Sequence, residues 1–236
     1  MKFVNDPIGY AIHDYTETAT DANITVKSDL CEDDVLPIPY LFRSIDQMPP
    51  IEQLALKRCS GKILDIGAAA GCHSIYLKNK GFNVTALDRS AGACAYLKDN
   101  NIPCHQMDFM EFHGEQFDTI LLLMNGIGLA GSLNQLPRVL QHLRKLLTPT
   151  GKILCDSTDI NYMYNNDDGS VWVDLNANYY GEMRFNMIYK EVESGWFPWL
   201  YIDSLKLIEY ATQEGFETEI LLEGKNNHYL AELKLD

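Results

Sequence analysis

Residues 67–71, with the sequence Gly-Ala-Ala-Ala-Gly, have the composition of a ligand-binding loop. The loop follows a predicted apolar strand and precedes a predicted helix, so its small residues let backbone amides approach a ligand at the helix N-terminus. Against the dinucleotide fingerprint G-x-G-x-x-G, the positions Gly67, Ala69 and Cys72 match once. Against G-x-G-x-G, the positions Gly67, Ala69 and Gly71 match twice. The spacing therefore disfavours a nicotinamide dinucleotide as the ligand.

Three aspartates accompany the predicted strands around this loop. Asp65 lies inside an apolar strand, where a buried carboxylate needs a partner such as an ammonium group or backbone amides. Asp88 ends the second strand, 21 residues after Gly67, where a carboxylate can accept hydrogen bonds from both hydroxyls of a ribose. Asp108 follows the third strand and could accept from an adenine amino group beside Phe109. Each also has a structural alternative: pinning the loop, forming a turn or N-cap, or closing a capping box.

The elements that must position these residues follow a regular alternation. Strands are predicted at 62–67, 83–87, 104–107, 117–124 and 152–155, separated by helices at about 71–80, 91–100 and a helix that opens at Ser132 or Asn134. A helix at 203–214 precedes two apolar runs at 216–222 and 228–235, which a Gly-containing turn joins. The predicted fold class is α/β, a doubly wound and mostly parallel seven-stranded sheet with an antiparallel C-terminal hairpin.

Two segments stand outside this alternation. Residues 1–50 are rich in acids and prolines, which predicts an irregular N-terminal cap segment with short helical turns beside a main domain at 51–236. An aromatic insert at about 160–202 contains two strand-like runs, which predict a β-hairpin after the fifth strand. We expect this insert to form a wall of the substrate site, and the alternative is a hairpin that needs an apolar face only to dock.

The charge and the cysteines restrict the class of partner and compartment. With 19 basic and 33 acidic residues the net charge is −14, and a chain with that field repels nucleic acids. The six cysteines show no CxxC pair and no metal-ligand spacing, so we expect buried thiols, no metal site and a reducing compartment. The first residues lack the pattern of a signal peptide and no apolar run is long enough for a membrane span, which predicts a cytoplasmic protein with no membrane partner.

Five motifs occur in a fixed order across about 55–236. They lie at 63–71, 84–88, 107–108, 117–119 and 147–152. As a set they resemble the class I S-adenosylmethionine-dependent methyltransferases. The segments 122–131, 156–159 and 196–200 resemble more narrowly a bacterial subgroup of unknown substrate. The resemblance implies S-adenosylmethionine as the cofactor.

The resemblance also implies roles for individual residues. Gly67, Ala68, Ala69 and Gly71 would surround the methionine part with Asp65 below it, Asp88 would bind the ribose, Asp108 the adenine, and Met124 with Asn125 would border the sulfonium. Arg89, Met107 and Phe109 complete the expected cofactor site, and Arg43 could pair with the methionine carboxylate. Ala69 departs from the family motif, which usually has glycine there, so its methyl group narrows the approach to the cofactor. The chain also lacks, after the fourth strand, the Asn-Pro-Pro-Tyr motif that is associated with methylation of exocyclic base nitrogens. Its absence agrees with the acidic charge, which disfavours nucleic acids.

Methyl transfer from a sulfonium is an in-line displacement, so much of its catalysis comes from orientation and no base is universally required. An acceptor with a high pKa would need one, and His73, Asp156 and Asp159 are the weak candidates. His73 is equally consistent with a helix-surface histidine, and the two aspartates with turn formers.

The expected acceptor is a small molecule that is compact, partly apolar, and neutral or cationic. The residues expected to bind it are Tyr40, Phe42, Gly126, Gly128, Trp196 and Trp199. Two alternatives remain open in the sequence: a nicotinamide-dependent oxidoreductase on a related sheet, and a non-catalytic scaffold protein with a degenerate cofactor loop. The oligomeric state is open.

Overall fold

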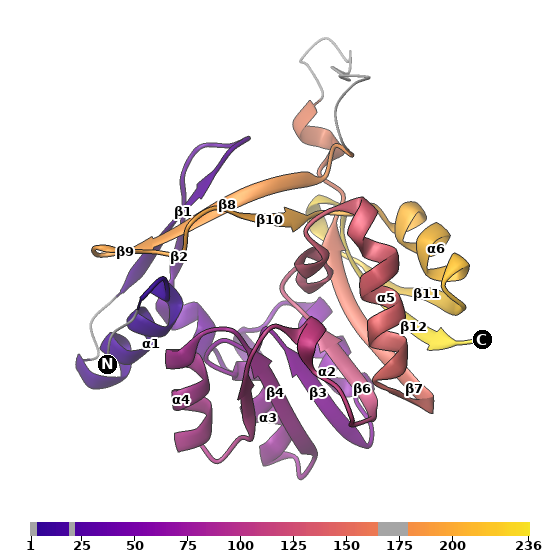
Figure 1. Ribbon diagram of the computed structural model, residues 1–236, viewed down its shortest axis with the longest axis horizontal. Coiled ribbons are helices and arrows are strands. Elements are labelled where there is room, and N and C mark those ends of the chain that lie inside the picture. The colour runs from indigo at the N-terminus through magenta and orange to yellow at the C-terminus, as the bar shows by residue number, and fades with distance from the viewer. Residues whose placement is uncertain (1–3, 19–21, 165–178) are drawn as a thin grey trace.

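A computed structural model describes residues 4–18, 22–164 and 179–236. Its main sheet has seven strands in the order β11-β12-β7-β6-β3-β4-β5 (Figure 1). Their bounds are β3 Lys62–Ile66, β4 Asn83–Asp88, β5 Cys104–Gln106, β6 Phe117–Leu122, β7 Leu147–Thr158, β11 Phe216–Glu223 and β12 His228–Leu235. Strands β3 to β7 are parallel, whereas β12 pairs antiparallel with both β7 and β11. The predicted fold class is confirmed.

Helices cover both faces of this sheet, as the alternation of strands and helices predicts. They are α2 Pro50–Arg58, α3 Cys72–Asn79, α4 Ala91–Asp99, α5 Leu136–Lys145 and α6 Ser204–Gln213. On β3, Ile63 packs with α2 and α3, whereas the next residue, Leu64, packs with α5 and α6. Two caps follow from side chains that precede a helix: Ser90 Oγ accepts from Ala93 N at 3.0 Å, and Asp203 Oδ1 accepts from Lys206 N at 2.9 Å.

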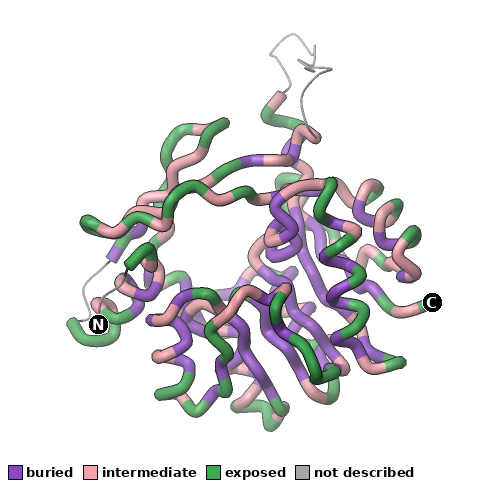
Figure 2. Tube along the Cα trace, in the orientation of Figure 1, coloured by how far each residue is buried: buried purple, intermediate pink, exposed green. Residues whose placement is uncertain are grey.

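A second, antiparallel sheet joins the N-terminal segment to the insert (Figure 1). Its order is β10-β8-β1-β2 with β9 paired to β8, and its strands are β1 Asn23–Ser28, β2 Asp34–Pro37, β8 Glu182–Tyr189, β9 Val192–Glu193 and β10 Phe197–Leu200. The pairing of β8 with β10 confirms the predicted hairpin. Buried residues concentrate along the strands of the main sheet, whereas the second sheet is mostly half-buried or exposed (Figure 2).

The expectation of an irregular segment at 1–50 is wrong. The segment forms the helix α1 Pro7–Thr18 and the strands β1 and β2, besides short 3₁₀ turns. Strand β1 takes its second partner from β8, with Thr25 opposite Ile188, so the segment is ordered by contacts far away in sequence. Helix α1 packs closely on α4, where a Cβ on Gly92 would lie 2.4 Å from the Cα of Gly9.

The cysteines also depart from expectation. Cys94 on α4 and Cys104 on β5 form a disulfide, and their Cα atoms lie 5.4 Å apart. Cys31, Cys59, Cys72 and Cys155 are free. The expectation of buried thiols therefore does not hold for this pair, because the packing of α4 beside β5 brings together two residues that the sequence spacing does not mark. No helix in the described ranges is long and apolar enough to cross a bilayer.

Candidate active site

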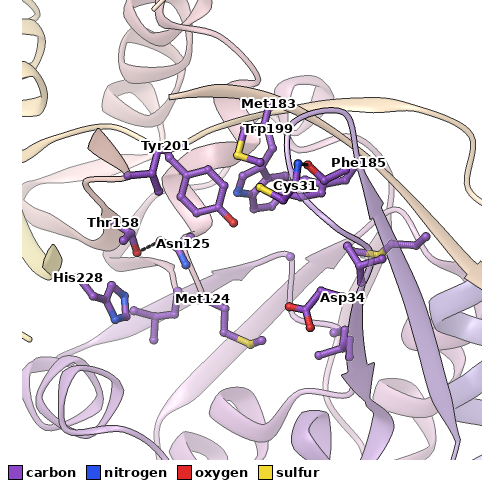
Figure 3. Close-up of a pocket in the computed structure, with 18 of the residues that line it drawn as sticks. Cys31, Asp34, Met124, Asn125, Thr158, Met183, Phe185, Trp199, Tyr201 and His228 are labelled. Carbon is purple, nitrogen blue, oxygen red and sulfur yellow. Dashed lines mark hydrogen bonds between the residues drawn. The ribbon is translucent and has the colours of Figure 1, made fainter. Parts of the chain in front are cut away.

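A cavity of about 730 Å³ lies between the carboxyl edge of the main sheet and the second sheet. The main sheet contributes Gly67, which follows β3, Met124, which comes after β6, and Thr158, which ends β7. The second sheet contributes alternate residues of β8 and of the run through β10. These are Met183, Phe185, Met187, Phe197, Trp199 and Tyr201. Figure 3 shows Tyr201, Trp199, Phe185 and Met183 on one side, with Met124 and His228 on the other. One cavity therefore joins the glycine-rich loop to the aromatic insert.

The glycine-rich loop lines this cavity through Gly67, Ala68 and Ala69. Gly71 does not line it but caps α3 at φ +75°, where a Cβ would lie 2.2 Å from Leu97 Cδ2, so the position requires glycine. Ala69 adopts φ +48°, a left-handed conformation that costs a residue with a side chain about 1 kcal/mol.

Four amides of this loop donate to acceptors inside the protein. Gly67 N and Ala68 N donate to Leu87 O at 2.8 and 3.3 Å, and Gly71 N donates to Ala68 O at 2.7 Å. Ala69 N donates to Asp88 Oδ2 at 2.8 Å. These four groups are therefore satisfied inside the protein, and a ligand beside them would meet the small side chains and the Cα surface of Gly67, Ala68 and Ala69.

Two carboxylates border the loop. Asp65 is buried and lines the cavity, and Ser74 Oγ donates to its Oδ2 at 2.6 Å. Burial raises the pKa of Asp65 against the opposing effects of His73 and Ser74. Asp88 accepts from Ala69 N and, through Oδ1, from Ser90 N at 2.8 Å. Burial likewise raises the pKa of Asp88, although both backbone bonds lower it. Asp88 thus fixes the loop to the end of β4. Its expected contact with a ribose stays a prediction.

A buried charge cluster lies next to the loop. Glu52 Oε2 accepts from Arg43 Nη2 and lies 2.7 Å from His73 Nε2, and all three residues are buried. Burial alone would raise the pKa of Glu52, but His73 and Arg43 lower it. Burial alone would lower the pKa of His73, but Cys72, Glu52 and Asp65 raise it to about 10. His73 is therefore protonated at neutral pH, and an imidazolium cannot act as a base.

Arg43 and its neighbours differ from the sequence-based picture. Arg43 does not line the cavity; besides Glu52 it donates from Nη1 to Tyr40 O at 2.5 Å, and its guanidinium stacks 3.9 Å from the Tyr40 ring. Its Nε is buried with no partner within the described residues. Tyr40 and Phe42 do not line the cavity either, whereas Leu41 between them does. The expected contact of Tyr40 and Phe42 with the substrate is therefore wrong for this cavity.

The carboxyl ends of β6 and β7 carry a second polar group of residues. Asp156 is fully buried; its Oδ1 accepts from Gly126 N at 3.3 Å, and its Oδ2 lies 2.6 Å from His228 Nε2. Asn125, at φ +56°, accepts from Thr158 Oγ1 at 2.8 Å through its Oδ1. Asn125, Thr158 and His228 line the cavity. Sequence reasoning missed His228, because only the antiparallel register of β12 on β7 brings it near Asp156.

Asp159, the third candidate base, has a structural role. Its Oδ1 accepts from Asn161 N at 2.9 Å and from the Tyr180 hydroxyl at 2.8 Å, and it does not line the cavity. The turn-forming alternative that the sequence left open therefore describes it better than a role in proton transfer.

The two tryptophans expected at the substrate differ in their surroundings. Trp199 lines the cavity above Gly128, where a Cβ would lie 2.1 Å from its Nε1. Trp196 is 46% exposed, lies outside the cavity lining and contacts Arg184. Trp196 precedes β10, whose side chains alternate between the two faces of the sheet. The expected substrate contact of Trp196 is therefore not supported by this cavity. Gly126 also lies outside the lining, against Leu122.

The residues expected around the adenine lie at the ends of β4 and β5, beyond the cavity lining. Asp108 Oδ1 accepts from Met110 N at 2.9 Å and so caps a 3₁₀ turn, as its structural alternative predicts. Met107 N donates to Asp88 O at 3.1 Å, Phe109 belongs to the core, and Arg89 is exposed. Their contacts with a cofactor stay predictions.

Comparisons with known proteins agree with this site. A methyltransferase domain family matches residues 63–151. A methyltransferase from Bacteroides fragilis, whose crystal structure contains S-adenosyl-L-homocysteine, is 38% identical, with 100% of this chain and 97% of that chain covered and a TM-score of 0.92. No curated protein matches the chain.

More distant structures show the same fold. CcbJ from Streptomyces caelestis is 13% identical, with 82% and 99% of the two chains covered and a TM-score of 0.62. DesVI from Streptomyces venezuelae is 16% identical, with 84% and 96% covered and a TM-score of 0.57. The Bacteroides fragilis relative favours a transferase over a nicotinamide-dependent oxidoreductase. The chain belongs to the class I S-adenosylmethionine-dependent methyltransferases, with S-adenosylmethionine as its cofactor.

Proposed function

We propose that this methyltransferase acts on a small molecule bound beneath the second sheet. The observation that carries the proposal is the shared cavity, which is lined both by the glycine-rich loop and by the inner face of β8 and β10. Its volume of about 730 Å³ lies in the range of small-molecule sites. A cofactor methyl group and a compact acceptor would therefore meet inside one cavity.

The walls of the cavity indicate the chemistry of the acceptor. The second sheet contributes aromatic and thioether side chains, which suit an apolar body or a cationic group. Glu32, Asp34 and Asp65 line the same cavity with one lysine, Lys225. The acidic majority, together with the net charge of −14, favours a neutral or cationic acceptor over a polyanion.

The residues present fit the cofactor. S-adenosylmethionine supplies a methyl group already activated on a sulfonium. Asp65, which is buried and lines the cavity, would accept from the methionine ammonium, and Gly67, Ala68 and Ala69 would pack against the methionine chain. Met124 and Asn125 border the same space at the end of β6. With donor and acceptor held on opposite sides of the cavity, orientation supplies most of the catalysis.

Replacing Asp88 with alanine should weaken the binding of S-adenosylhomocysteine by about 1–3 kcal/mol, roughly 5- to 150-fold. The change removes the proposed ribose acceptor and also the bond that fixes Ala69 N. Isothermal titration calorimetry measures the affinity, and Asp99→Ala, an exposed aspartate at the end of α4, is the control. An unchanged affinity in Asp88→Ala would place the ribose elsewhere.

The class of acceptor can be tested by following the label from methyl-tritiated S-adenosylmethionine in a bacterial lysate. We expect label in the small-molecule fraction, because the cavity has the volume of a small-molecule site and carries Glu32, Asp34 and Asp65 in its lining. Label mainly in RNA, DNA or protein would contradict the proposal.

Trp199 and Trp196 provide a matched pair for the acceptor site. Trp199→Ala should lower methyl transfer to the small-molecule fraction about 10-fold or more, because it removes an aromatic wall worth 1.4 kcal/mol or more. Trp196→Ala should leave transfer unchanged, because its side chain faces away from the cavity. Both variants should bind S-adenosylhomocysteine like the wild type. Equal losses in the two variants would contradict the assignment of the inner face.

A further inference from the structure

His228 and Asp156 form a histidine–carboxylate pair at the edge of the cavity. His228 begins β12 and Asp156 lies in β7, and their Nε2 and Oδ2 atoms are 2.6 Å apart. Asp156 is fully buried, so its carboxylate needs donors, and it has two: Gly126 N and the His228 ring. The methyltransferase fold alone does not require a histidine at the start of β12.

The hydrogen bond determines which ring nitrogen of His228 carries the proton. A buried carboxylate accepts, so Nε2 must be the protonated nitrogen in the neutral ring. Nδ1 then carries the lone pair, and it has no partner within the part of the chain that the structure describes. The side chain is 24% exposed and lines the cavity, so a molecule inside can reach the ring. The pair therefore presents a proton acceptor to the cavity.

The position of His228 matches the site of methyl transfer. In Figure 3, His228 lies beside Met124, on the side of the cavity opposite Trp199 and Phe185. Asn125 lies between His228 and Trp199. Its Oδ1 accepts from Thr158, which leaves its amino group free to donate a hydrogen bond to the methyl acceptor. The same end of the cavity thus offers a donor and a proton acceptor next to the expected position of the sulfonium.

We propose that His228 is a catalytic residue that takes the proton from the acceptor's nucleophilic N–H or O–H group, and that Asp156 is its positioning residue. The inference rests on the proposed small-molecule function. A bond forms between the acceptor heteroatom and the methyl carbon, while the carbon–sulfur bond breaks and its electron pair stays on sulfur. The acceptor proton moves to Nδ1 of His228, whose Nε2–H stays with Asp156.

The two candidate bases nearest to the glycine-rich loop, His73 and Asp65, do not compete for this role. His73 is already protonated, and Asp65 lies under the glycine-rich loop. His228 contacts Asp156 from β7, and Lys225 from the preceding turn and Tyr201 after β10 line the same cavity. Burial raises the pKa of Tyr201 to about 12, so its hydroxyl is neutral and can donate but not accept a proton readily.

The kinetic test is single-turnover transfer of label to the small-molecule fraction of a bacterial lysate. His228→Gln keeps an amide donor for Asp156 but removes the basic ring nitrogen Nδ1. We therefore expect the rate to fall about 10²-fold or more, while S-adenosylhomocysteine binds normally. The wild-type rate should rise with pH, because only the neutral ring can take a proton, and the variant should lose this dependence. His113→Gln, an exposed histidine, is the control. A variant with the wild-type rate and pH profile would overturn the inference.

A second measurement does not depend on the acceptor. Nitrogen-15 NMR of labelled histidine should show neutral His228 with its proton on Nε2, and Asp156→Asn should shift the population toward the Nδ1–H tautomer. Wild-type His228 protonated on Nδ1 would overturn the inference even if no acceptor were labelled. If the wild type labels no small molecule, the proposed function fails, whereas labelling that is equally fast in His228→Gln contradicts only the role of His228.

Discussion

Replacing Glu52 with glutamine should lower the free energy of unfolding by about 3–5 kcal/mol. Glu52 Oε2 is the shared acceptor of Arg43 and His73, and the side chains of all three residues are almost completely buried. The glutamine amide removes the negative charge that Arg43 and His73 share, and it leaves the buried Arg43 guanidinium without its counter-ion. Denaturant unfolding at neutral pH measures the change.

Glu115→Gln is the matched control for this experiment. Glu115 also pairs with a cation, Lys62 at 2.6 Å, but both side chains are substantially exposed. Solvent screens such a pair, so its loss should change the free energy of unfolding by less than about 1 kcal/mol. If the two variants were equally stable, the cluster around Glu52 would not hold the charges that its geometry implies.

The main sheet and its helices were predictable because their signals are local. Buried parallel strands are continuous apolar runs, and residues 63–66 and 119–122 have that pattern. The glycine-rich loop was also recognisable, since Gly71 adopts a backbone conformation that glycine favours. What the loop does with its amides was not predictable, because their acceptors, Leu87 O and Asp88 Oδ2, come from the neighbouring strand.

The second sheet shows where local signals end. Strand β1 is ordered by β8, which lies more than 150 residues later, and only one of its six positions is fully buried. Without a clear alternation the segment looks irregular. In the insert the strand was predictable, but which of its side chains line the cavity was not. The alternation separates Trp196 from Trp199, and only the pairing with β8 shows which of them faces the cavity.

The candidate bases illustrate the same limit for chemistry. The sequence identified Asp156 and His73 by their positions after a strand and after the glycine-rich loop. Their roles depend on partners brought by tertiary contacts: Glu52 keeps His73 charged, and His228 completes the pair with Asp156. Spacing along the chain shows neither contact, since 72 residues separate Asp156 from His228.

The charged state of His73 also predicts how stability depends on pH. In the unfolded chain His73 has an ordinary pKa near 6.5, whereas in the folded protein Cys72, Glu52 and Asp65 raise its pKa to about 10 against the effect of burial. The folded state therefore binds one more proton than the unfolded state between these values. This stabilisation is complete below about pH 6.5 and is lost as the pH rises toward 10, at about 1.4 kcal/mol per pH unit in the middle of the window.

His73→Gln isolates this contribution, because the amide can still donate to Glu52 but does not titrate. The free energy of unfolding of the wild type should fall between about pH 7 and 9, relative to the variant, with the slope of one proton. Other groups titrate in both proteins, so the difference between the two curves is the quantity to measure. Parallel curves would mean that His73 is neutral in the folded protein, and His73 would then return as a candidate base beside the glycine-rich loop.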